Sequence, residues 1–155
     1  MSGGAEEPAL REALARWASG VTLVAVDDDG DRLAMVASAF TPVSLDPPLV
    51  LVCVRRGAMI LPSLRDVGRF VVSLLAAEQH PLASNTAAGL QVPPETFADG
   101  ADPLVRGALA SLVCTVREVH PGGDHVIVVG EVEEVFVGED GAALAYFRRG
   151  YVTVG

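Results

Sequence analysis

Residues 35–54 read MVASAFTPVSLDPPLVLVCV. The stretch begins with small residues, Asp46-Pro47-Pro48 predicts a turn, and the last part is a strand pattern that is apolar on both faces. The run Ala37-Ser38-Ala39 would let a flat ligand come close to the backbone, with the hydroxyls of Ser38 and Thr41 available to orient it. The same pattern fits a β-barrel hairpin whose small residues lie where strands crowd together.

Strand patterns continue along the rest of the chain. A long run near the end changes from continuously apolar residues to one that carries Glu131, Glu133 and Glu134, which predicts a strand that enters a core and then leaves it. No strand–helix–strand rhythm is present, so we expect a mainly β fold, an antiparallel sheet closed or nearly closed into a barrel. The predicted strands are 21–26, 32–37, 40–45, 49–54, 69–75, 109–119, 125–137 and 142–147.

A few short helices are expected at the periphery of this barrel. Apolar spacing and proline positions predict them at 7–18, 61–67 and 78–88, with Gly20 just beyond the end of the first. Segment 89–104 has no periodicity, and a loop of that length in a compact domain is often functional. We therefore interpret it as a binding lid.

Length and charge restrict the class of protein. Half of the 155 residues are apolar, which predicts a single domain over 1–155. The net charge of −9 argues against binding to nucleic acid or to anionic lipid. No apolar run approaches the roughly 20 residues that span a bilayer, and Met1–Glu7 lack the features of a signal peptide. A cytoplasmic protein without membrane association is the expectation.

The cysteines and two of the histidines suggest no special chemistry. Cys53 and Cys114 stand far apart in apolar runs, without the paired spacing of zinc or redox motifs, and are expected to be buried free thiols. His80 is interpreted as a solvated surface residue of the third helix, and His120 as a turn residue. No metal pattern is present among the three histidines.

His125 is the strongest candidate for a functional histidine. It follows Gly123-Asp124 at the start of a long strand, where a tight turn can direct an imidazole into a cleft and Asp124 can orient it. An exposed histidine after a turn fits the spacing equally well.

Two arginine pairs stand at predicted strand ends, Arg55-Arg56 and Arg148-Arg149. Planar guanidinium groups match phosphate oxygens in two-point contact, so these pairs are candidate phosphate clamps in an acidic chain. Arginines that are exposed to solvent in turns and bind no ligand would give the same sequence pattern. The chain has no nucleophile-elbow, Walker or dinucleotide GxGxxG motif, which leaves hydrolase and nucleoside-triphosphatase functions without support.

Four ordered segments, 17–24, 35–54, 68–72 and 123–130, resemble the short-chain flavin reductase family. Its members are the reductase components of two-component flavin-dependent monooxygenases and have an FMN-binding split-barrel fold of the Greek-key type. The most specific matches are Ser-Leu-Asp-Pro-Pro at 44–48 and Gly-Asp-His at 123–125. The resemblance covers nearly the whole chain.

The resemblance implies a homodimer that holds FMN or FAD near the subunit interface. NADH or NADPH would dock over the flavin, and hydride would pass from the nicotinamide C4 to the flavin N5. Reduced flavin would then diffuse to a partner monooxygenase. By motif, the flavin would be met by Val36, Ala37, Ser38, Ala39, Phe40 and Thr41, with Cys53, Val54, Arg55, Arg56 and Ala58 nearby. The nicotinamide would be met by His125 beside Asp124, and the dinucleotide by Phe147, Arg148, Arg149 and Gly150.

The chain departs from the family pattern mainly on the flavin side. Val36 and Ala39 stand where hydroxyl residues are common. The family usually has a serine-rich stretch that includes a basic residue after the central strand, and residues 57–60 of this chain contain neither. Residues 82–87 offer neither the usual basic nor the usual aromatic residue, and Phe147 replaces a common histidine. A reductase that treats flavin as a loosely held substrate is one interpretation. The alternatives are a non-reductase carrier, sensor or accessory subunit, and an enzyme with a reassigned pocket.

Overall fold

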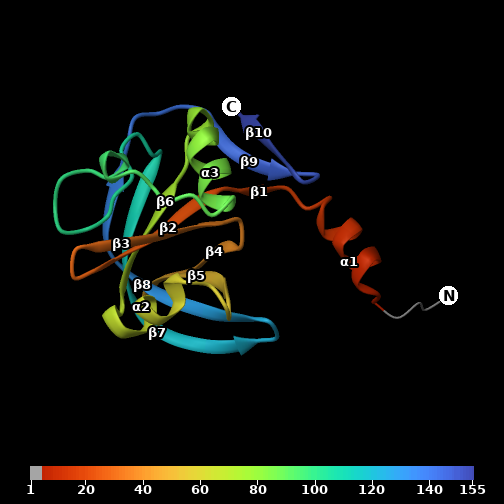
Figure 1. The fold of residues 1–155 in the computed structure, drawn as a ribbon, viewed down its shortest axis with the longest axis horizontal. Helices are drawn as coiled ribbons and strands as arrows, with labels where there is room; N and C mark the ends of the chain where they lie inside the picture. Colours follow the sequence, from red (N-terminus) through yellow and green to blue (C-terminus); the bar gives the residue numbers. More distant parts are fainter. Residues whose placement is uncertain (1–4) are drawn as a thin grey trace.

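The computed structural model describes residues 5–155 (Figure 1). Strands predominate, and the helices are short. The elements are α1 (Glu7–Leu14), β1 (Ser19–Gly20), β2 (Thr22–Asp28), β3 (Asp31–Ala37), β4 (Phe40–Leu45), β5 (Pro48–Arg55), α2 (Ile60–Val67), β6 (Arg69–Leu74), α3 (His80–Ala87), β7 (Ala110–Gly122), β8 (His125–Val137), β9 (Ala143–Phe147) and β10 (Gly150–Val154), with short 3₁₀ turns at Ala77–Gln79 and Pro94–Thr96.

Seven strands form one antiparallel sheet in the order β3-β2-β6-β7-β8-β5-β4. Its two edge strands, β3 and β4, follow each other in the chain and are joined by Ser38-Ala39 alone. Because the two edges of the sheet are joined this closely, the sheet must curve back on itself. The prediction of a mainly β fold with an antiparallel barrel is confirmed.

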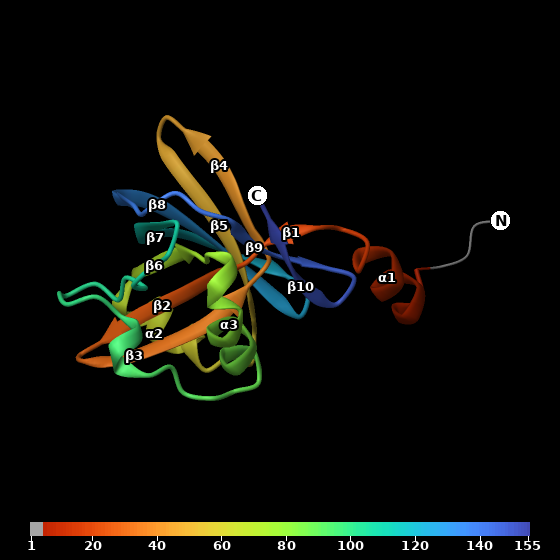
Figure 2. The same cartoon turned by 90° about the horizontal axis from the view of Figure 1, so that it is seen from above.

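The remaining strands form a small second sheet, β1-β9-β10, beside the barrel. Figure 2 shows this sheet on the side from which α1 extends away from the barrel. Within residues 5–155, no helix has the length and apolar character needed to cross a membrane.

The interior of the barrel is filled by alternate residues of its strands and closed by α2. Val52 and Val54 of β5 are fully buried, and Ile60, Leu61 and Leu64 of α2 pack into the same cluster. β8 crosses this core at Gly130, where a Cβ atom would come within 2.6 Å of the Phe70 ring. Gly130 therefore leaves room for the Phe70 ring against the main chain of β8.

A second cluster packs on the outer face of β2. Strand alternation directs Val24 and Val26 into the barrel and Leu23 and Ala25 into this outer cluster, which explains why the strand is buried on both faces. Its other buried members come from the residues next to β2 and β6, from α3, from the segment after α3 and from β9, namely Val21, Leu75, Ala83, Phe97, Val105, Ala108 and Leu144.

The structure corrects several local predictions. All eight predicted strands exist, but β1 and β10 were missed, since each is short and half or more exposed. The predicted end of the first helix at residue 18 is wrong, because α1 ends at Leu14. The chain then turns, and Ser19-Gly20 pair with β9. His120 is not a turn residue, because it lies in β7 and pairs with Ile127 of β8.

Other predictions hold in part. Cys114 is a buried free thiol, and burial raises its pKa to about 12, whereas Cys53 is only half-buried. His80 is exposed as expected, although its ring lies 4.8 Å from that of Tyr151. The signal-peptide analysis concerns Met1–Glu7, of which 1–4 lie outside the described residues.

The predicted lid, 89–104, is fastened to the barrel over its second half. Arg69 makes a two-point contact with the Asp102 carboxylate at 2.8 and 2.9 Å. The Arg32 guanidinium donates to the carbonyl of Gly100 at 2.6 Å, and the Phe97 side chain is buried in the outer cluster. The hydrogen bonds from Arg69 hold the pKa of Asp102 below its usual value near 3.8.

Replacing Asp102 with Asn should destabilise the protein at neutral pH only. The pKa of Asp102 is lower in the folded state than in the unfolded state. Its contribution to the unfolding free energy is therefore present above the unfolded-state pKa and is lost as pH falls through the folded-state pKa. For this partly exposed pair we expect Asp102→Asn to lower the unfolding free energy at pH 7 by up to about 1 kcal/mol. In urea titrations the difference from wild type should vanish toward pH 2.

Asp66→Asn, on the exposed face of α2, is the matched control and should not lower the unfolding free energy. A difference between Asp102→Asn and wild type that is the same at pH 7 and pH 2 would contradict the role of this ion pair.

Candidate functional site

The link between β3 and β4 is a fixed main-chain feature with small side chains. The Thr22 hydroxyl donates to the Ala37 carbonyl at 2.7 Å, and the Cys53 amide donates to the Ala39 carbonyl at 3.0 Å. Among the hydrogen bonds of the described residues, none uses the amide N–H of Ser38 or Ala39. This link therefore presents two amide donors to a ligand without a long side chain in the way.

The predicted residues on either side of this link differ in accessibility. Ala37 is buried, and Val36 and Phe40 are half-buried against the outer and inner clusters respectively. Ser38, Ala39 and Thr41 are exposed. Within residues 36–41, these three are the ones with exposed side chains.

The end of β5 lies next to the link. Cys53 contacts it through its amide, but the Val54 side chain is fully buried inside the barrel, so Val54 can meet a ligand only through its main chain. Arg55 is the last residue of β5 and pairs with His125, the first residue of β8. Ala58, in the turn that follows, is half-buried against the inner cluster.

The turn between β7 and β8 presents His125. Gly122 pairs with His125, and Gly123 between them has φ +68°, a left-handed conformation that favours glycine. The His125 Nδ1 lies 2.7 Å from the Asp124 Oδ1, and this hydrogen bond holds the pKa of Asp124 below its usual range. A neutral imidazole that donates its Nδ1–H to this carboxylate has Nε2 free as an acceptor.

Strand pairing and hydrogen bonds thus bring three predicted groups together: the link, the end of β5 and the Gly-Asp-His turn. The fourth group, Phe147–Gly150, lies elsewhere. Figure 1 shows the β9–β10 turn well separated from the β7–β8 turn within this one chain. The structure does not bring Arg148 or Arg149 to His125.

The β9–β10 turn has an unusual backbone. Arg148 and Arg149 have φ values of 50° and 61°, which non-glycine residues seldom adopt. The Arg148 amide donates to the Ala15 carbonyl at 2.8 Å, and the Arg149 guanidinium lies 3.4 Å from the Glu12 carboxylate. These contacts fasten the turn to the end of α1.

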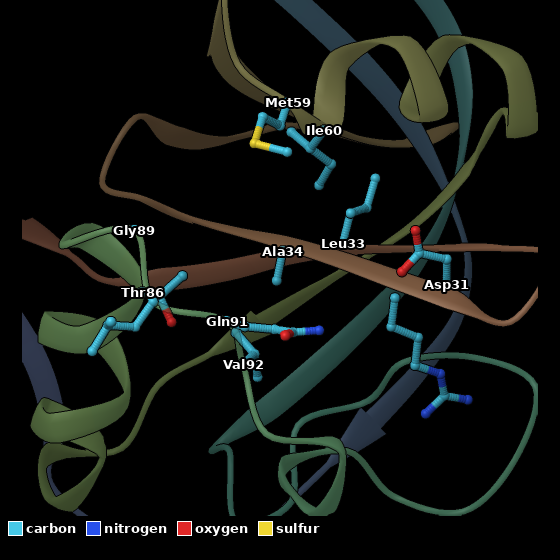
Figure 3. Close-up of a pocket in the computed structure, with 11 residues that line it drawn as sticks. Asp31, Leu33, Ala34, Met59, Ile60, Thr86, Gly89, Gln91 and Val92 are labelled. Carbon is cyan, nitrogen blue, oxygen red and sulfur yellow. The ribbon is translucent and has the colours of Figure 1, made fainter.

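A cavity of about 340 Å³ lies beside β3 (Figure 3). Figure 3 shows Leu33 and Ala34 of β3 between Met59 and Ile60 on one side and Thr86, Gln91 and Val92 on the other. The residues from 89–104 fall in the segment that the sequence predicts to bind, whereas the β3 residues and Thr86 carry no such prediction. The signal was available in β3, where alternate residues face away from the barrel core along an edge strand.

This cavity has little positive charge. Within residues 5–155, Arg32 is the one basic residue that lines it, and its guanidinium is already bound to Asp27 at 2.8 Å and to the Gly100 carbonyl. On the other side of Met59, an open hollow is bordered by Arg56 and Arg65. Arg65 is a candidate phosphate-facing residue that the sequence analysis missed, since a single arginine on a helix resembles any solvated charge.

A smaller apolar cavity of about 270 Å³ lies behind the link. Ser38 and Phe40 line it together with residues of β2, β6 and β9. No group of three or more metal-ligating side chains occurs among residues 5–155.

The family comparison matches residues 14–155 to the flavin reductase-like domain. Among curated proteins, the chain is 48% identical over 145 residues to the reductase component of 4-hydroxyphenylacetate 3-monooxygenase of Thermus thermophilus, covering 92% of this chain and 93% of that protein. It is 41% identical over 148 residues to an NADH-dependent flavin reductase of a Rhodococcus species, covering 92% and 83%.

Solved structures agree with these matches. The flavin reductase component of a bacterial two-component tryptophan halogenase superposes with a TM-score of 0.89 at 38% identity, covering 96% of this chain and 98% of that one. An NADH:FAD oxidoreductase of Streptomyces globisporus, solved with NAD and FAD fragments, gives a TM-score of 0.85 at 28% identity, covering 98% and 94%.

Proposed function

The chain belongs to the flavin reductase-like family, and from this membership we propose that it is an NADH- or NADPH-dependent reductase of FMN or FAD. It supplies reduced flavin to a separate monooxygenase. The Thermus reductase component and the Rhodococcus flavin reductase each match it over more than four-fifths of their own length. This supports the reductase over a carrier, a sensor or an enzyme with a reassigned pocket.

The observation that carries the proposal is the cluster of the link, the end of β5 and the Gly-Asp-His turn. Two contacts support it, the 3.0 Å hydrogen bond from Cys53 to Ala39 and the pairing of Arg55 with His125. When bound, the pyridine nucleotide supplies a hydride and the flavin accepts it. The chain's own task is to hold two flat rings in contact.

The link is the proposed seat of the flavin ring. The amides of Ser38 and Ala39 donate to polar atoms at the ring edge, and Val36, Ala37, Phe40, Thr41, Cys53 and Val54 complete its surroundings. The turn at 123–125 faces the nicotinamide, with the Nε2 atom of His125 as acceptor and Asp124 holding the ring orientation.

The proposed phosphate contacts are few. Arg55 stands at the rim of the flavin seat with Ala58, and Arg148 and Arg149, with Phe147 and Gly150, form the proposed dinucleotide contact. Each charge-assisted contact contributes about 1.5–3 kcal/mol, so a site with few of them binds flavin weakly. Weak binding suits a reductase whose flavin leaves as product.

The first test is oxidation of NADH and NADPH at 340 nm by purified protein with FMN, FAD or riboflavin. We expect many turnovers for each protein molecule, and the rates rank the flavins and the nucleotides. Flavin binding, followed in parallel by fluorescence, without nicotinamide oxidation would overturn the reductase and favour a carrier or accessory role.

A second test addresses the histidine. His125→Ala should raise the KM for NADH or lower kcat/KM by about 10- to 100-fold, because one contact to the nicotinamide side is lost. The Kd for flavin should stay within twofold of wild type. His120→Ala is the matched control, since His120 is exposed on β7 and bonded to Glu118 at 2.7 Å. Equal effects of the two substitutions would exclude a specific role for His125.

A homodimer in the cytoplasm, with one domain in each subunit, is also proposed. Large apolar side chains are exposed on separate elements, including Trp17 at 75%, Leu45 at 97% and Val137 at 82%. Burial in a second subunit would remove such surface from water. Light scattering should give twice the 16.1 kDa chain mass, and the mass of a single chain would refute the dimer.

A further inference from the structure

Arg56 hydrogen-bonds the turn that presents His125. Its amide N–H donates to the Asp124 carbonyl at 3.0 Å, and its Nε–H donates to the Gly123 carbonyl at 2.7 Å. The two acceptors are the consecutive carbonyls directly before His125. One residue thus holds both peptide groups of the turn, from a position 67 residues away in the chain.

The two hydrogen bonds from Arg56 lie just beyond the end of the β5–β8 strand pairing. The β5–β8 ladder stops at the pair of Arg55 with His125, and Gly123 and Asp124 lie beyond it. The Asp124 side chain is 92% exposed, so its carboxylate has no packing to hold it. Among the described residues, Arg56 is the one outside β7 and β8 that hydrogen-bonds the main chain of Gly123 and Asp124.

We propose that Arg56 is a positioning residue for His125, and not the flavin-phosphate ligand that the sequence suggested. It fixes the carbonyls of Gly123 and Asp124, and through them the direction of the imidazole and its bond to Asp124. The inference rests on the proposed function, because that function assigns His125 to the nicotinamide. A phosphate ligand would act by charge, whereas a positioning residue acts through the Nε–H donor.

Two substitutions separate these roles. Arg56→Lys keeps the positive charge but places a methylene group where the Nε–H donor stands. Arg56→Met keeps a similar stem and loses both the charge and the donor. Both changes leave the hydrogen bond from the main-chain amide of residue 56 to the Asp124 carbonyl in place. The turn should therefore be loosened and not unfolded.

We expect both variants to lower kcat/KM for NADH by a similar factor, about 3- to 10-fold, because each loses one hydrogen bond to the turn. The Kd for FMN, measured by fluorescence titration, should stay within twofold of wild type, and so should the flavin KM. Arg117→Lys and Arg117→Met are matched controls, since Arg117 pairs with Glu131 at 2.6 Å on an exposed part of β7 and β8. Their kinetics should equal those of wild type.

The proposal is overturned if Arg56→Met weakens FMN binding and Arg56→Lys restores it, which is the behaviour of a phosphate ligand. It is also overturned if both variants match wild type in kcat/KM. Absence of NADH oxidation by the wild-type protein would instead refute the proposed function.

The position of His125 can be tested without any activity. Nitrogen-15 spectra of the His125 ring should report the Nδ1–H form in wild type and a mixture of ring forms in Arg56→Met. An unchanged His125 signal in Arg56→Met overturns the positioning role whether or not the protein is a reductase.

Discussion

The barrel depends on the two-residue link between its edge strands. Ser38-Ala39 joins β3 directly to β4, the opposite edges of a seven-stranded sheet, so the sheet can satisfy this connection only by curving round on itself. The hydrogen bond from Cys53 to the Ala39 carbonyl fixes the link against β5. Small side chains are suited to a place where three strands approach one another.

Closure of the barrel sets the position of everything else near the site. The inner faces of the strands need a cover, which α2 supplies with Ile60, Leu61 and Leu64. The turn from β5 into α2 then lies beside the β7–β8 turn, because β5 and β8 are neighbours in the sheet. The residues at the rim are thus held by a rigid scaffold, which is the arrangement that binding sites commonly use.

Local sequence patterns predicted the elements that are long or strongly alternating. The buried part of β8 and its glutamate-bearing end were predicted correctly, since Val126 and Val128 are buried and 133–137 are exposed. β10 was missed because its five residues have no buried side chain to mark them. His120 was misplaced because Pro121-Gly122 reads as a turn, whereas β7 continues through both residues by pairing with β8.

The sequence by itself determined the fold class, the positions of eight strands and the family, since alternation and ordered motifs are local properties of the chain. Only the tertiary structure decided which candidate residues meet. It paired Arg55 with His125, bonded Arg56 to the turn before His125, and kept the β9–β10 turn apart from that turn within the chain. It also formed the cavity between β3, the start of α2 and the beginning of segment 89–104. These contacts follow from strand order and closure, which bring together residues that no local pattern connects.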